Sequence, residues 1–190
     1  MKEVLRYMIR KSLANHRLLS KMMSLLGAFL LVLSLWLPFV SATDVYKEYL
    51  TKYPDIMYYE PLNMKNQEAV HISLVEFAKI YYTSFENERS KEISITCFVI
   101  ICVLASFMIL ILLFCLLKKP ILIGLFNSLI LCIFQLLKFD FEDRGVIPTK
   151  QYDWGMAQYV FYLGVILIFA GAIWIFLTKR KDKKGELKNV

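Results

Sequence analysis

The residues best suited to chemistry in this chain are a carboxylate and an imidazole three positions apart, Glu68 and His71. Residues at this spacing share one face of a helix. Paired Glu-x-x-His segments hold metals in helical bundles when other helices add carboxylates. The chain has one such segment and no glycine-rich phosphate loop, and zinc sites normally use more His or Cys ligands. Glu68 and His71 are therefore weak metal candidates, and we expect no metal, no cofactor and no enzymatic activity.

The four cysteines are informative through their positions. Cys97, Cys102, Cys115 and Cys132 all lie inside long apolar segments. We therefore expect no disulfide framework of the kind that stabilises small secreted domains. The same absence separates the chain from claudins and tetraspanins, which share a long first outer loop and a short second one but normally carry cysteine pairs outside the membrane.

Two side-chain amides, Asn127 and Gln135, interrupt the third apolar segment. In hydrocarbon an unpaired amide costs several kcal/mol, so both side chains should face protein or water. Gly124, Ser128, Cys132 and Gln135 repeat at spacings of four, four and three, with Asn127 beside them. We expect this stripe to pack against the second and fourth apolar segments of the same chain. An oligomer contact and a polar pathway remain the alternatives.

Small residues also recur in the fourth apolar segment. Ala157, Gly164 and Gly171 are seven residues apart. Small side chains allow helix backbones to approach closely within a membrane, and a seven-residue period favours a left-handed crossing. This pattern predicts a helix–helix contact along that face.

The elements that must position these residues are membrane-spanning helices. Of the 190 residues 58% are hydrophobic, with a mean hydropathy of +0.52, whereas soluble domains have about 45–50% apolar residues. The excess is concentrated in four blocks, each near or above the roughly 20 residues that cross a bilayer. They predict transmembrane helices at 22–40, 93–117, 120–138 and 156–178.

Charge predicts the orientation. Most of the 23 Lys and Arg residues lie at the two termini and in the Lys118-Lys119 turn, which four spans would place on one side. Positive charge favours the cytoplasmic side, so we expect both termini in the cytoplasm and the chain in a plasma membrane or a bacterial inner membrane. The net charge of +7 then indicates contacts with anionic lipid headgroups, and we expect no nucleic-acid partner.

The segments outside the spans have distinct patterns. Residues 1–21 predict a basic amphipathic helix and 179–190 a basic cytoplasmic tail, while 139–155 is a short outer loop. The outer segment 41–92 is rich in tyrosine and is predicted to contain a helix at about 66–92. Partner-binding candidates in it are aromatic or apolar: Tyr58, Tyr59, Val70, Leu74, Phe77, Tyr81 and Phe85.

Together these patterns predict an all-α integral membrane protein. It would consist of a four-helix bundle with an N-terminal amphipathic helix and a small, mainly helical outer segment. We expect an accessory or sensing subunit that binds a membrane-protein partner or a second copy through its outer loop and its small or polar helix faces. A small transporter or channel subunit, with the third span lining a polar path, is the alternative.

Overall fold

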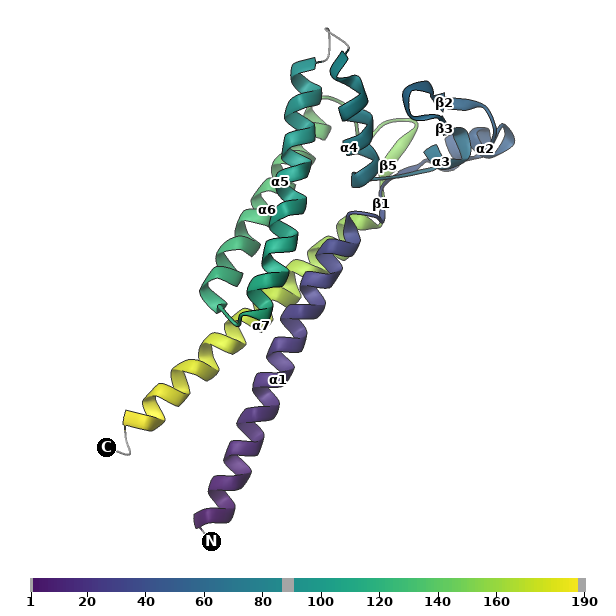
Figure 1. The fold of residues 1–190 in the computed structure, drawn as a ribbon. Helices are drawn as coiled ribbons and strands as arrows, with labels where there is room; N and C mark the ends of the chain where they lie inside the picture. The colour runs from purple at the N-terminus through teal and green to yellow at the C-terminus, as the bar shows by residue number, and fades with distance from the viewer. Residues whose placement is uncertain (1, 87–90, 188–190) are drawn as a thin grey trace.

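The computed structural model describes residues 2–86 and 91–187 of the chain, and these residues are predominantly helical, as predicted. Figure 1 shows long helices in a bundle with both chain termini at one end and a small domain of mixed structure at the other. We call this opposite end the distal end. The distal domain comprises residues 38–86 and 144–155.

Three helical segments of the described chain are long and apolar enough to cross a membrane. They are α5 (Lys91–Leu116), α6 (Pro120–Asp143) and the Ala157–Thr178 part of α7 (Ala157–Leu187). An apolar helix is the natural structure in lipid because every backbone N–H and C=O is paired within the segment. A shorter apolar stretch, Leu18–Ser34, belongs to α1 (Lys2–Ser34).

The first helix differs from the prediction at both ends. The amphipathic helix predicted at 1–21 and the span predicted at 22–40 are one continuous helix, α1, which ends at Ser34. Leu35 and Trp36 close a tighter turn by donating to Val32 and Leu33, and the chain then enters a strand at Pro38. At the other terminus α7 continues through the predicted tail to Leu187, and 188–190 lie outside the described residues.

Small residues set the crossing of α1 and α7, which pack along one another (Figure 1). A Cβ added to Gly27 would lie 2.6 Å from the Gly164 carbonyl oxygen, and one added to Gly171 would lie 2.1 Å from Ser24 Oγ. The glycines of the fourth apolar segment therefore face α1. Ala157 is buried at the distal end of the same helix.

The distal domain is built on a three-stranded antiparallel sheet. Its central strand β1 (Pro38–Ala42) pairs with β4 (His71–Ser73) on one side and β5 (Tyr152–Trp154) on the other. The loop predicted at 139–155 is therefore divided: α6 extends through 139–143, and β5, which lies between α6 and α7, joins the sheet. The Gly155 N–H donates to the Phe39 carbonyl, and a Cβ there would lie 2.2 Å from the Pro38 oxygen, so only glycine fits this approach.

The helix predicted at 66–92 is divided into α3 (Asn66–Ala69), β4, α4 (Leu74–Thr83) and the 3-10 turn η2 (Ser84–Glu86). Strand β4 interrupts it because residues 71–73 pair with β1. Ser73 then caps α4 by accepting from the Glu76 N–H at 3.2 Å, while the Glu76 carboxylate accepts from the Ser73 N–H. The predicted residues 87–90 lie outside the described chain, and α4 packs against α5.

The remaining segments form an arm, which we define as residues 43–70. It projects sideways from the distal end (Figure 1). It contains α2 (Asp44–Lys52), β2 (Met57–Tyr59), the 3-10 turn η1 (Glu60–Leu62), β3 (Met64–Lys65) and α3. Strands β2 and β3 pair with each other, and a small cluster of Leu50, Met64, Ala69 and Val70 forms the core of the arm. The predicted mainly helical outer segment thus contains two small sheets.

Aromatic packing joins the distal domain to the bundle. The fully buried Phe39 of β1 makes edge-to-face contacts with Phe77 of α4, Phe134 and Phe141 of α6, and Trp154 of β5, with centroid separations of 5.4 to 6.1 Å. Such pairs stabilise by about 0.5–1.5 kcal/mol each beyond their buried area. The distal domain and the spans therefore share one apolar core.

Candidate functional site

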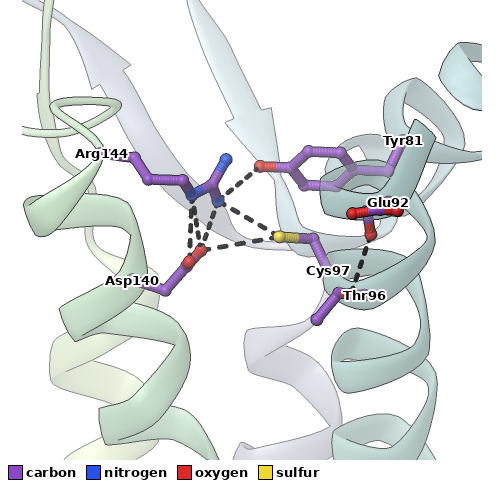
Figure 2. A network of polar contacts seen from close by, with 6 residues as sticks. All are labelled: Tyr81, Glu92, Thr96, Cys97, Asp140 and Arg144. Atoms are coloured by element: carbon purple, nitrogen blue, oxygen red, sulfur yellow. Dashed lines mark hydrogen bonds and ion pairs between the residues drawn. The ribbon is translucent and has the colours of Figure 1, made fainter. Parts of the chain in front are cut away.

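The most developed polar site is a cluster of Tyr81, Cys97, Asp140 and Arg144, which we call the Arg144 cluster. Figure 2 shows these side chains converging from α4, α5 and the end of α6. Arg144 Nε lies 3.0 Å from both Asp140 carboxylate oxygens, and Nη2 also donates to Asp140. The same Nη2 lies 3.3 Å from the Tyr81 hydroxyl and 3.2 Å from Cys97 Sγ. One guanidinium thus links three helices.

The electrostatics of the cluster keep the Tyr81 hydroxyl neutral and the Arg144 guanidinium charged. Burial raises the pKa of Tyr81 to about 12, although the hydrogen bond from Arg144 acts in the opposite direction. Burial alone would lower the pKa of Arg144, but its hydrogen bonds with Asp140 and Tyr81 outweigh this effect and raise it. The cation also lies over the Phe141 ring, 5.5 Å from its centroid. The guanidinium is therefore held charged and in place.

This arrangement is suited to fastening rather than to a reaction. Cys97 is buried, and its thiol donates to Asp140 at 3.6 Å, so it is not presented to a substrate. No histidine belongs to the cluster. Charge-assisted hydrogen bonds are stronger than neutral ones, and here they tie the distal helix α4 to the ends of α5 and α6.

The weak metal candidates lie on different elements. Glu68 is in α3, and its carboxylate accepts from the Lys65 N–H at 2.8 Å. His71 is in β4, and its Nδ1 lies 3.1 Å from Ser41 Oγ. The helical face that would have brought them together does not form. Among the described residues no group of three or more His, Cys, Asp or Glu side chains could hold a metal ion.

The predicted partner-binding residues pack within the chain. Val70, Leu74 and Phe77 are buried, and Tyr81 belongs to the Arg144 cluster. Phe85 packs against Phe98 of α5 at 5.5 Å. The helical apolar stripe forms only from Leu74 onward, where it packs on the bundle, whereas Val70 lies before β4 and packs in the core of the arm. These residues are therefore not a free surface.

Tyr58 and Tyr59 are half-buried on β2. The Tyr59 hydroxyl lies 3.2 Å from Thr83 Oγ1 and 3.0 Å from Ser84 Oγ, which joins the arm to the end of α4. These tyrosines therefore serve the contact between the arm and the rest of the distal domain.

The polar stripe of α6 divides into an inward and an outward part. Asn127 is fully buried and donates from Nδ2 to the Val165 carbonyl of α7 at 3.0 Å, while its Oδ1 has no hydrogen-bond partner among the described residues. Ser128, Cys132 and Gln135 are exposed on the outside of the helix. A Cβ at Gly124 would meet nothing within 4 Å. Packing within the chain, predicted for the whole stripe, holds fully for the buried Asn127 and in part for Gln135, which is exposed but donates from Nε2 to the Tyr162 hydroxyl of α7 at 3.1 Å.

A cavity of about 320 Å³ lies in the distal domain, and we call it the distal cavity. Phe77 and Ile80 of α4 line it together with residues of the sheet, of β2 and of the loop that follows Arg144. In the part of the chain that the structure describes, no charged side chain lines it. Sequence reasoning missed this cavity because its walls come from segments far apart in the chain.

The ion pair between Asp140 and Arg144 had a signal in the sequence, since these residues have the i,i+4 spacing of helical ion pairs.

The fold and these sites define the class as a helical membrane protein with a small distal domain fastened to its spans. Comparison with protein-family models, with curated proteins and with solved structures finds no match.

Proposed function

We propose that the protein is a four-span, non-enzymatic accessory or sensing subunit that associates sideways in the membrane with a second copy or another membrane protein. The fourth span is the apolar part of α1, which lies along α7. Positive charge at both termini favours a cytoplasmic location for them. The distal domain then faces outward from a plasma membrane or a bacterial inner membrane.

The outward face of α6 is the observation that carries this proposal. Ser128 can satisfy its own hydroxyl by donating to the Gly124 carbonyl at 3.1 Å. Gln135 donates from Nε2 to the Tyr162 hydroxyl of α7 at 3.1 Å, and its carbonyl oxygen has no partner among the described residues. An amide left unpaired in hydrocarbon costs several kcal/mol. A neighbouring helix that pairs with Gln135 removes this cost.

The geometry of this face also favours a close neighbour. Gly124, Ser128 and Cys132 are four residues apart, and small residues at this spacing let two helices approach closely. A two-fold axis would bring the same face of a second copy against it. A glutamine amide both donates and accepts, so Gln135 can pair with its own counterpart. A second copy is therefore the simplest occupant.

The transport alternative has less support in the geometry of one chain. A polar path would place Ser128 and Gln135 between the helices, but both are exposed on the outside of α6. The inward Asn127 is occupied by the Val165 carbonyl. The same residues therefore favour lateral association.

Native cysteines provide the test. Oxidative cross-linking in native membranes should yield a disulfide-linked dimer through Cys132. The Cys132→Ser variant should lose this dimer, whereas Cys102→Ser, which removes the exposed thiol of α5, should keep it. An adduct of another mass, also lost in Cys132→Ser, would identify a different membrane-protein partner. A wild-type chain that gives no Cys132 adduct and has the mass of a monomer in mild detergent would refute the proposal.

A further inference from the structure

The distal cavity has walls from four parts of the distal domain. Val40 and Ile72 come from the sheet, Val146 and Ile147 from the loop after α6, and Phe77 and Ile80 from α4. The half-buried Tyr58 and Tyr59 close it from the arm. All of these walls present apolar or aromatic surface. The cavity is separate from the outward face of α6.

Three of the hydroxyl groups on the wall are already engaged by the protein, and the Gln151 side chain is a further polar group of the lining. The Tyr152 hydroxyl donates to the Ala69 carbonyl at 2.8 Å. The Thr149 hydroxyl oxygen accepts from the backbone N–H groups of Gln151 and Tyr152 at 3.1 and 2.9 Å. The Tyr59 hydroxyl is bonded to the end of α4. A water molecule needs two to four polar partners, and this wall offers mainly hydrocarbon.

We propose that the distal cavity binds a single acyl chain of an anionic amphiphile. Ligand pockets commonly measure about 300–1,000 Å³, so a cavity of about 320 Å³ is at the small end and suits one chain rather than two. The uncharged apolar wall excludes a charged or sugar-like occupant, because such a group would lose its hydration without new hydrogen bonds.

The position of the cavity would allow an amphiphile to enter it from the bilayer. The Phe77 ring, which lines the cavity, contacts the Phe141 ring of α6 at a centroid distance of 5.3 Å. Phe141 lies near the distal end of a span, so the cavity lies beside the surface of the bilayer in which amphiphiles are concentrated.

Charge next to the cavity favours an anionic headgroup. Lys150 lies between Thr149 and Gln151, both of which line the cavity, and it is exposed. It makes no ion pair with any described residue. Its ammonium is therefore available to pair with a carboxylate or phosphate, in the manner of other surface cation–anion contacts.

Occupancy would act on the contacts that fasten the distal domain. Ile80 and Val146 line the cavity, and each is within two residues of a member of the Arg144 cluster. An acyl chain between them bears on α4 and on the loop after α6, the two segments that Arg144 links to α5. The cavity thus gives the distal domain a means of responding to amphiphiles.

Photolabelling of the full chain tests the site. A fatty acid and a single-chain phospholipid, each with a diazirine near the chain end, are added separately to the protein in lipid nanodiscs. Label should appear in the peptide that contains Phe77 and Ile80. Labelling by the fatty acid alone would identify a free amphiphile as the source, and labelling by the phospholipid would identify a membrane lipid. Label confined to the lipid-facing spans with both probes would overturn the proposal.

Matched variants separate the cavity from the surface. Ile80→Trp fills the cavity and should reduce labelling of this peptide about tenfold. Ile56→Trp, on an exposed position of the arm, should leave it unchanged. Val146→Phe fills the cavity from the opposite wall and serves if Ile80→Trp does not fold, as judged by circular dichroism. Lys150→Gln should weaken labelling by the fatty acid but not by the matching uncharged alcohol. Normal labelling in a folded filling variant would refute the site.

Discussion

Replacing Gly27 by alanine should destabilise the crossing of α1 and α7. The new Cβ would lie 2.6 Å from the Gly164 carbonyl oxygen, 2.8 Å from Ile168 Cγ1 and 2.9 Å from Ile168 N. Two of these three atoms belong to the backbone of α7, so a change of side-chain rotamer cannot relieve the clash. The helices must move apart.

The size of the effect follows from the distance that is missing. Ordinary contacts begin at 3.4 Å, so the shortfall at Gly164 is 3.4 − 2.6 = 0.8 Å. A gap of about 0.5–1 Å forfeits a quarter to a half of the dispersion attraction of the contacts it opens. Overpacking of this kind costs about 1–3 kcal/mol. The better helix propensity of alanine returns up to about 1 kcal/mol.

Gly124→Ala is the matched control because a Cβ there meets nothing within 4 Å. The propensity gain is common to both variants, so the difference between them measures the overpacking cost, about 1–3 kcal/mol. The free energy of unfolding is measured by titration with SDS in mixed micelles, followed by circular dichroism, at protein concentrations where the chain is monomeric. Equal stability of the Gly27→Ala and Gly124→Ala variants would refute the close crossing of α1 and α7.

Three further predictions concern the Arg144 cluster and the thiols. Arg144→Gln should lower the free energy of unfolding by about 1–3 kcal/mol because Asp140 loses its partner, and Arg144→Lys should recover only part of this, since lysine lacks the forked geometry; equal stability of all three proteins in mixed micelles would contradict this. The pKa of about 12 for Tyr81 lies above its ordinary value of 10.0, so the folded state holds the proton more tightly. Its contribution to stability is complete below pH 10 and is lost as the pH rises through 12, about 2–3 kcal/mol in all. Tyr81→Phe should lack this component, and an identical pH dependence in both proteins would exclude it. In mild detergent, at concentrations where the chain is monomeric, a small maleimide should modify Cys102 and Cys132 faster than the two buried cysteines, as mass spectrometry can show; equal rates at all four thiols would contradict the burial of Cys97 and Cys115.

Much of the helical architecture could be predicted because it depends on local composition. The span predicted at 93–117 corresponds to α5, and the one predicted at 120–138 forms the greater part of α6. The spacing of Gly164 and Gly171 indicated a close helix contact, although it could not name α1 as the partner. Helix hydrogen bonds join residues four apart, so a short window of sequence contains the cause of the structure.

The distal domain was less predictable because its structure depends on distant partners. Strands β1, β4 and β5 contain three to five residues each, too few for a clear alternating pattern. The apolar spacing of Leu74 and Phe77 correctly marked a helical face. This face contacts α5 and, through Phe77 and Phe141, α6, and no local pattern contains that information.

The candidate sites follow the same division. The sequence by itself determined that Asn127 and Gln135 lie in an apolar helix and need polar partners, since residue types and hydropathy are properties of the chain. Only the tertiary structure decided that Asn127 turns inward to Val165 while Gln135 faces out of the bundle. It also decided that Tyr81 and Cys97 form hydrogen bonds with Arg144, and that Phe77 lines a cavity. Exposure and proximity depend on how distant elements pack together, and residues that meet, such as Val40 and Tyr152 in the cavity wall, are far apart in the chain.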